Sequence, residues 1–228
     1  MFTAEEWEAI ELSLWVATWA VVASLPLAIP LGYFLARWKR PSKWLIETAV
    51  NLPLVLPPVV TGYILLVLFG SQGGLGGPLE HWLGIHIAFS WIGAALAAGV
   101  VSFPLMVRTI RIAFSGVDER LEGVARTLGS GPLDTFLSVS LPLAFRGVLA
   151  GSMLAFARSL GEFGATIMLA GNIPGRTQTI PTAVFSLVQT PGGVSRSGRL
   201  VLVSVLLACL TLAVSEILER RRQRRESA

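Results

Sequence analysis

The sequence predicts an all-α membrane protein with about five transmembrane helices, built as a single domain over residues 1–228. Hydrophobic residues make up 53% of the chain and charged residues only 14%, whereas soluble domains carry about 25% charged residues. The mean hydropathy is +0.68. The stretches 12–36, 48–79 and 82–107 hold no Asp, Glu, Lys or Arg. Each is long enough for a membrane span, which needs about 20 residues.

The first span is predicted at 10–36, after an acidic start that lacks Lys and Arg. Pro26 and Pro30 fall in its second half, where neighbouring helices must satisfy the freed backbone carbonyls. Residues 37–44 then combine four cations with two tryptophans. That combination is typical of a cytoplasmic loop at the membrane interface.

The second span is predicted at 47–69, and three prolines within it predict a broken or kinked helix. Either packing fills the kink, or the irregular backbone lines a polar pathway where water or protein satisfies it. The pathway interpretation is favoured for Pro57 and Pro58. The next loop, 70–86, is rich in glycine and lacks Lys and Arg, so it is expected on the external side.

Three more spans complete the set, at 88–112, 142–169 and 198–218. The polar segment between the last two contains a short apolar piece, 180–188, which is too short to cross a membrane. Pro181 suits a helix start there. The basic tail at 220–225 is suited to binding anionic membrane lipid.

The distribution of Lys and Arg predicts the orientation. The basic side has four such residues in 37–43, four in 108–126 and five in 220–225. The other side has none at the N-terminus, none in 70–86 and three in 171–199. Since the basic side is cytoplasmic, the N-terminus is expected in the periplasm and the C-terminus in the cytoplasm. The polar segment 121–142 is then cytoplasmic as well.

The fourth span carries the most informative membrane residues. Small residues recur at every fourth position, namely Gly147, Gly151, Ala155 and Ser159, which predicts a face for close helix packing. Arg158 and Glu162 share one helix face at i, i+4 spacing, and charged residues inside a span are costly. They either form a mutual ion pair that fixes the helix, or Arg158, Ser159 and Thr166 border the path of a small anion. In the second case Glu162 holds Arg158.

Several chemistries are excluded by what the chain lacks. A phosphate-binding P-loop needs a lysine after glycine, but Lys39 and Lys43, the only lysines, do not follow one. Cys209 is the single cysteine, and both histidines, His81 and His86, fall in one external loop. No catalytic residue, metal site or cofactor is therefore expected in this chain. The net charge of +4 follows the membrane topology, so no nucleic-acid partner is expected.

The cytoplasmic segment 121–142 has an acid at Glu122, then Ala125 and Gly129, and nine residues later Val139-Ser140-Leu141-Pro142. This resembles the EAA loop of bacterial ABC importer permeases, with Val124 in place of the first alanine. The resemblance implies a type I importer fold and a short helix that docks in a cleft of a cytoplasmic ATPase. The alternative is an ordinary loop between helices.

The residues assigned to coupling by this resemblance are Glu122, Ala125, Arg126, Leu128, Gly129, Leu141 and Pro142. Glu122 is expected at the beginning of the short helix, where an acid complements the helix dipole and could pair with a basic residue of the ATPase. Ala125, with its small side chain, is expected to let the docking face of this helix enter the ATPase cleft. Gly129 is expected to let the chain turn after the helix.

A second resemblance rests on FARSLGEFGATI at 156–167, followed by NIPG at 172–175, TIP at 179–181 and QTPGG at 189–193. These runs strongly resemble the molybdate ABC transporter permeases, and sulfate permeases are similar too. The resemblance implies a homodimer in the bacterial inner membrane and a periplasmic molybdate-binding protein. It also implies two ATPase subunits, which bind ATP and magnesium and supply the energy.

The expected cargo is molybdate, with tungstate as a related oxyanion, and the alternative is a sulfate or thiosulfate permease. Two other classes fit the sequence less well. An intramembrane enzyme would need more than Arg158 and Glu162, since no second carboxylate or histidine accompanies them away from the helix ends. A secondary transporter would show an inverted repeat, which five spans do not provide.

Overall fold

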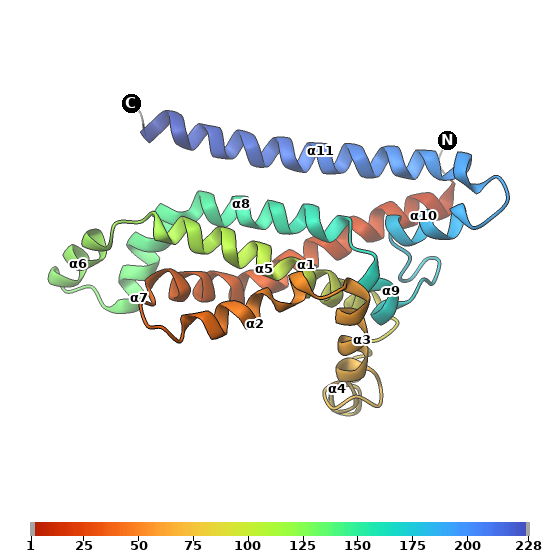
Figure 1. Ribbon diagram of the computed structural model, residues 1–228, viewed down its shortest axis with the longest axis horizontal. Helices are drawn as coiled ribbons and strands as arrows, with labels where there is room; N and C mark the ends of the chain where they lie inside the picture. The colour runs from red at the N-terminus through yellow and green to blue at the C-terminus, as the bar shows by residue number, and fades with distance from the viewer. Residues whose placement is uncertain (1–2, 227–228) are drawn as a thin grey trace.

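The computed structural model describes residues 3–226, with side chains described as far as Val214. Every regular element in this part of the chain is helical (Figure 1), which confirms the predicted all-α class. In order, the elements are α1 (Ala4–Arg37), α2 (Lys43–Val55), α3 (Pro58–Phe69), α4 (Gly76–Leu83), α5 (Trp91–Ser115), α6 (Glu119–Thr127), α7 (Pro132–Thr135), the π-helical turn η1 (Phe136–Ser140), α8 (Leu141–Leu160), α9 (Gly164–Ala170), α10 (Ile180–Val188) and α11 (Gly193–Glu226).

Four helical stretches are long and apolar enough to cross a membrane, and the bent pair α2–α3 makes a fifth if it counts as one span. These four are Ala4–Arg37, Trp91–Ser115, Pro132–Leu160 and Gly193–Val214. The sequence prediction of about five spans is confirmed to that extent. The basic tail predicted to bind lipid continues α11, but its side chains lie outside the described residues.

Helix α5 is the centre of the bundle, with α1 and α8 packed along it (Figure 1). In its apolar window 61% of the residues are buried, against 11% in α11, so α5 is the helix that the others surround. The small residues of α8 allow the close approach. A Cβ atom at Gly147 would lie 2.1 Å from Ala113, and one at Gly151 would lie 3.2 Å from the Met106 carbonyl. The predicted packing face is confirmed.

The second span is broken rather than gently kinked. Helices α2 and α3 meet at an angle of 108°, and the break falls at Leu56-Pro57. Pro57 and Pro58 lack the N–H groups that would continue α2, while Pro58 occupies the first turn of α3, where proline is well tolerated. Beyond the break, α3 packs on α9, and α4 at its far end projects away from the bundle (Figure 1).

The prediction of one helix over 142–169 is wrong at both ends. At its first end the helix already starts at Pro132 and runs through the π-turn η1 into α8. The wider turn directly precedes Pro142, whose missing N–H removes one α-helical hydrogen bond. At the other end, α8 stops at Leu160 and α9 starts at Gly164. Leu141 and Pro142 are therefore part of a helix and not the end of a loop.

The two broken helices meet each other. A Cβ atom at Gly164, the first residue of α9, would lie 2.8 Å from the Pro58 side chain. A Cβ atom at Gly62 in α3 would lie 2.7 Å from the backbone of Ala165. Glycine is needed at both positions because a larger residue would separate α3 from α9. The irregular backbone of both spans is thus gathered in one region, where α3 packs on α9 (Figure 1).

Candidate functional site: coupling helix and charged residues of the spans

Helix α6 stands at one end of the molecule, together with α7 and the loop after α1 (Figure 1). It begins after Asp118, whose carboxylate accepts a hydrogen bond from Arg120 N at 2.9 Å. It ends at Thr127, and Gly129, with φ +97°, turns the chain after it. Ser130 N donates to the Ala125 carbonyl, and Gly129 N to that of Arg126, both at 3.1 Å. This is a Schellman motif, so the predicted turn at Gly129 is confirmed.

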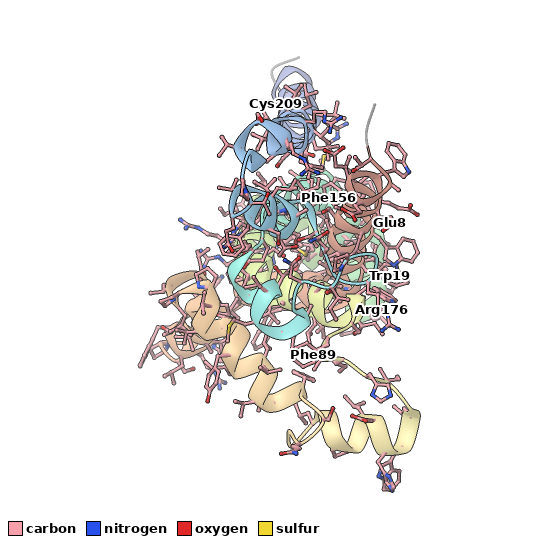
Figure 2. All side chains as sticks on the ribbon, turned by 90° about the vertical axis from the view of Figure 1, so that its right-hand side faces the viewer. Glu8, Trp19, Phe89, Phe156, Arg176 and Cys209 are labelled. Atoms are coloured by element: carbon pink, nitrogen blue, oxygen red, sulfur yellow. The ribbon has the colours of Figure 1, made fainter. Side chains whose placement is uncertain are left out.

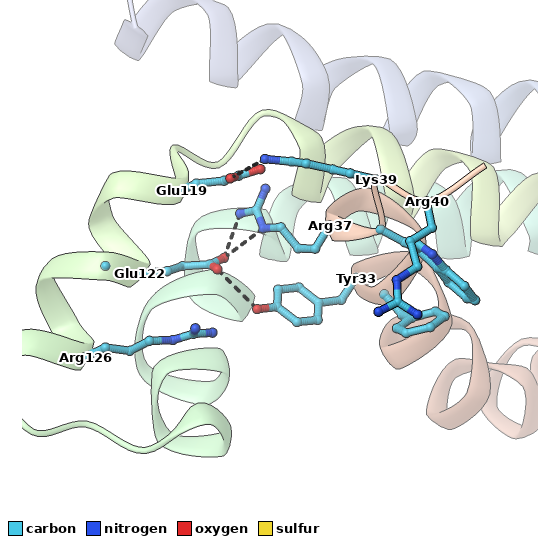
Figure 3. A pocket seen from close by; sticks show the side chains of 10 residues that line it. Tyr33, Arg37, Lys39, Arg40, Glu119, Glu122 and Arg126 are labelled. Carbon is cyan, nitrogen blue, oxygen red and sulfur yellow. Dashed lines mark hydrogen bonds and ion pairs between the residues drawn. The ribbon is translucent and has the colours of Figure 1, made fainter. Parts of the chain in front are cut away.

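Glu122 is buried, with 6% of its surface exposed, and its carboxylate faces the body of the protein (Figure 3). Arg37 donates to Oε1 from Nη2 at 2.6 Å and from Nε at 3.2 Å. Ser140 donates to the same oxygen at 2.8 Å, and the Tyr33 hydroxyl donates to Oε2 at 3.2 Å. Arg37 also donates to the Val117 carbonyl at 3.0 Å. One carboxylate therefore joins α6 to α1 and to η1.

These contacts correct the expected role of Glu122. The sequence suggested an outward acid that pairs with an ATPase residue. In the structure the carboxylate instead accepts hydrogen bonds from Tyr33, Arg37 and Ser140 of the same chain. Burial alone would raise the pKa of Glu122, but hydrogen bonds from Arg37 and Ser140 and the charge of Arg37 outweigh it and lower that pKa. Glu122 is thus an ionised anchor, and α6 also begins earlier than expected, at Glu119.

Sequence reasoning missed the partners of Glu122. The charge pattern indicates only a basic loop at Arg37 and gives no signal for Tyr33, although the two residues lie one helical turn apart at the end of α1. Ser140 fell inside the EAA pattern without a role. The pairing between Arg37 and Glu122 spans 85 residues, so no local pattern could predict it. The only available signal was the opposite charge of the two segments 37–43 and 118–122, which does not single out this pair.

The opposite face of α6 and the start of α7 are apolar and exposed. The exposed side chains are Leu121 (48%), Val124 (57%), Leu128 (82%) and Leu133 (70%). Ala125 is half-buried between them, and Arg126 is exposed beside them. On the other side of α6 lies a cleft of about 850 Å³, lined with Tyr33, Arg37, Lys39, Arg40 and Arg126, among others (Figure 3). Leu141 and Pro142 take no part in this surface, since both lie in α8.

An exposed apolar helix face on a short, rigidly held helix is suited to a protein partner. We expect Ala125→Arg to abolish binding of an ATPase while the helix bundle stays folded, because the new side chain would stand on the face where the resemblance to the EAA loop places the ATPase. Gly129→Pro should do the same by destroying the turn, since proline cannot adopt a positive φ. The measurement is copurification of the ATPase with each variant. Full association of both variants would mean that this segment is an ordinary loop.

The second group of predicted residues surrounds the break between α8 and α9. Arg158 Nη1 lies 2.8 Å from Glu162 Oε2, and the predicted ion pair is present. Glu162 Oε1 accepts a hydrogen bond from Ala165 N at 2.9 Å. Only 2% of the Glu162 side chain is exposed, against 32% for Arg158. Glu162 therefore holds both Arg158 and the start of α9, which fits the helix-fixing hypothesis and the anion-path hypothesis equally.

The remaining polar residues of this group are held within the bundle. Ser159 donates to the Ser102 hydroxyl of α5 at 3.1 Å, and Thr166 donates to the Phe163 carbonyl at 2.9 Å. Both residues are buried. Arg158 is thus the member of this set with accessible polar atoms. Pro57 is exposed and Pro58 half-buried at the neighbouring break.

No group of three or more His, Cys, Asp or Glu side chains within the described residues is arranged to hold a metal ion. Glu122 is instead paired with Arg37, and Glu162 with Arg158. Arrangements of this kind position helices and can guide an anion past a guanidinium group, but they offer no nucleophile with an adjacent base.

Known proteins resemble this chain over most of its length. Residues 28–224 match the family model described as the binding-protein-dependent transport system inner membrane component. The chain is 53% identical to the molybdenum transport system permease protein ModB of Escherichia coli K12, over 96% of each chain. It is 49% identical to ModB of Haemophilus influenzae, again over 96% of each chain.

Solved structures with low sequence identity share the fold. A bacterial alginate ABC transporter in complex with its substrate-bound periplasmic protein aligns with a TM-score of 0.72 at 14% identity, over 96% of this chain and 80% of that one. The MetNI methionine ABC transporter aligns with a TM-score of 0.66 at 15% identity, over 94% and 93%. Taken with the sequence matches, these results show that the chain belongs to the family of binding-protein-dependent transport system inner membrane components and is a relative of the molybdenum transport permeases.

Proposed function

We propose that this chain is the membrane subunit of an ATP-driven importer that carries molybdate across the bacterial inner membrane. Relatives named for molybdenum transport, at 49–53% identity over nearly the full chain, support molybdate as cargo. A Zygnema circumcarinatum protein named "Probable sulfate transport system permease protein cysT" is 34% identical over 79% of this chain and 62% of its own length. Sulfate is therefore the second candidate, and tungstate is expected to compete with molybdate.

The observation that carries the proposal is the geometry of α6. Its inner face is fixed by the buried Glu122–Arg37 pair, and its outer face is apolar and exposed at Leu128 and its neighbours. A helix held this firmly can transmit force to α1 and α8. The ATPase is expected to dock on that outer face and to bind ATP and magnesium.

Two copies of the chain are expected to form the pathway, with one ATPase for each copy. The spans leave large apolar surfaces on α2, α3 and α11 exposed, which a second copy or lipid would cover. A periplasmic binding protein is expected to deliver the oxyanion at the end opposite α6. Arg158 is the proposed guide for the anion in the outer half of the membrane, beside the meeting point of the two broken helices.

The topology gives a direct prediction. With Cys209 replaced by alanine, Ala4→Cys should react with a membrane-impermeant thiol reagent in intact spheroplasts, and Leu133→Cys should react only after lysis. The reason is the gathering of Lys and Arg on the α6 side. Both positions are exposed in the folded chain, so protection reports sidedness. Labelling of both from outside would contradict the proposed orientation.

Uptake of labelled molybdate and sulfate into proteoliposomes tests the cargo. The vesicles should contain this chain with its ATPase, ATP and the binding protein. We expect ATP-dependent uptake of molybdate that unlabelled tungstate suppresses and sulfate does not. Sulfate uptake without molybdate uptake would assign the chain to the second candidate function.

A further inference from the structure

A small polar cavity of about 270 Å³ lies between α2 and α5, near the α6 end of the bundle. Its polar lining residues are Glu47, Asn51, Arg108 and Arg111, and its apolar ones include Leu54 and Pro104. None of them belongs to the coupling helix or to the Arg158 group. Arg108 is seven residues before the end of α5, or about 10 Å along the helix axis. The cavity therefore lies close to the inner membrane boundary.

The charges in this cavity do not cancel. Glu47 is the one carboxylate among the lining residues, and it already forms ion pairs with Arg111 and, at 3.5 Å, with Lys43. Arg108 makes no ion pair among the side chains described through Val214, and it is exposed. A guanidinium at this depth needs an anion or water as partner. The Arg108 guanidinium thus lines the cavity without an ion-pair partner among the described side chains.

The neighbouring amide suits the same ligand. Asn51 Nδ2 donates to the Glu47 carbonyl at 2.6 Å, and this uses one of its two N–H groups. Arginine binds tetrahedral oxyanions through paired N–H donors. The space equals that of about nine water molecules at about 30 Å³ each, enough for an oxyanion with part of its hydration shell.

The geometry points to an oxyanion-binding site in this cavity, with Arg108 as the main ligand, Asn51 as the second donor, and Glu47 as the residue that keeps Arg111 occupied. The ligand is a tetrahedral oxyanion from one of two sources. It is the transported oxyanion on its way into the cytoplasm, which rests on the proposed function, or the phosphate of an inner-leaflet lipid headgroup. The site is separate from Arg158, which belongs to the outer half of the path.

The single cysteine of the chain makes the test direct. Cys209 is exposed on α11 (Figure 2) and can be replaced by alanine. Leu54→Cys then places one thiol in the lining of the cavity. The permease–ATPase complex is purified in a maltoside detergent, which has no phosphate, and the rate of maleimide labelling is measured. Sodium molybdate, sodium chloride of equal ionic strength, or phosphatidylglycerol is added.

We expect molybdate to slow the labelling and chloride to leave it unchanged. Arg108→Gln should raise the molybdate concentration for half-protection about tenfold, the effect of losing one charged hydrogen bond. Arg108→Lys should raise this concentration by a smaller factor. Arg146→Gln is the matched control. Arg146 is an exposed arginine near the start of α8, outside the cavity, and this variant should be protected by molybdate as the parent is. Glu47→Gln should strengthen protection because it frees Arg111.

Each outcome decides the question. Protection by phosphatidylglycerol but not by molybdate identifies the lipid phosphate as the ligand. Absence of protection by both, protection that Arg108→Gln does not alter, or a thiol that never reacts would overturn the site. Uptake of molybdate by the parent complex is measured in parallel. If uptake is lost but molybdate still protects the thiol, the proposed function is refuted and the site stands. If uptake is normal but molybdate does not protect the thiol, the site is refuted and the proposed function stands.

Discussion

Glu122→Ala is expected to release α6, the proposed coupling helix, from the membrane bundle and to abolish transport. The substitution removes four hydrogen bonds at once, from Arg37, Ser140 and Tyr33, and leaves the Arg37 guanidinium, with 17% of its side chain exposed, without its carboxylate. Breaking a pair of this kind costs about 2–3 kcal/mol, somewhat less than the loss of a fully buried one. Since α6 would no longer hold its position, ATP-dependent uptake should fall at least about tenfold.

Glu119→Gln provides the matched control. Glu119 precedes Glu122 by one turn and pairs with Lys39 at 2.8 Å, but both side chains are more than half exposed. An exposed pair contributes less than about 1 kcal/mol, so this variant should transport normally. The measurement is uptake together with copurification of the ATPase. Equal behaviour of the two variants would contradict the anchoring role of Glu122.

The Glu122 pair also predicts how the coupling helix responds to acid. Because the pKa of Glu122 is lowered from its ordinary value of 4.5, the stabilisation is complete above that value and is lost as the pH falls through the lower folded pKa. ATPase association should therefore be insensitive to this group near neutral pH. In Glu122→Gln, the loss of ATPase association at acid pH that is due to this carboxylate should be absent.

Substitution of Glu162 is expected to have the second large effect. Glu162→Ala removes the partner of Arg158 and the acceptor for Ala165 N, so α9 loses its start and a guanidinium is left unpaired inside a span. Arg158→Ala leaves the Glu162 carboxylate, at 2% exposure, without its cation. Both single variants should express poorly or lose transport. Removing one partner of a fully buried pair costs about 3–5 kcal/mol, and the cost here is somewhat less because 32% of the Arg158 side chain is exposed.

The double variant Arg158→Met, Glu162→Gln distinguishes a role of this pair in helix packing from a role in anion transport. Both charges are gone, and the amide that replaces the Glu162 carboxylate keeps an oxygen that accepts from Ala165 N. Assembly with the ATPase should recover. Uptake should remain low, because Arg158, the proposed guide for the anion, is missing. Wild-type uptake by this assembled variant would show that Arg158 only fixes the helix and that the anion passes elsewhere.

The sequence predicted those features that short patterns encode. Apolar runs marked the spans, Pro181 marked the start of α10, and the Pro57-Pro58 pair marked a break. The spacing of Arg158 and Glu162 gave their ion pair. In each case the cause lies within a few residues of the effect, so a local pattern contains the information.

Features that depend on distant contacts were not predictable in this way. The inward direction of Glu122 depends on Arg37, which lies 85 residues away. The break between α8 and α9 depends on Glu162 accepting from Ala165 N and on Gly164 packing against Pro58, although no proline marks it. The cavity around Arg108 needs α2 and α5 side by side. Tertiary packing decides all three.

Photo-crosslinking from α6 tests the central claim most directly, namely that the chain is driven by a separate ATPase bound to the outer face of this helix. A photoreactive amino acid replaces Leu128, which is 82% exposed, or, as a control, Leu83 of α4, which is 65% exposed. In membranes with ATP-dependent molybdate uptake, position 128 should crosslink to the ATPase and position 83 should not. A transport-competent complex in which position 128 never reaches the ATPase would contradict the account.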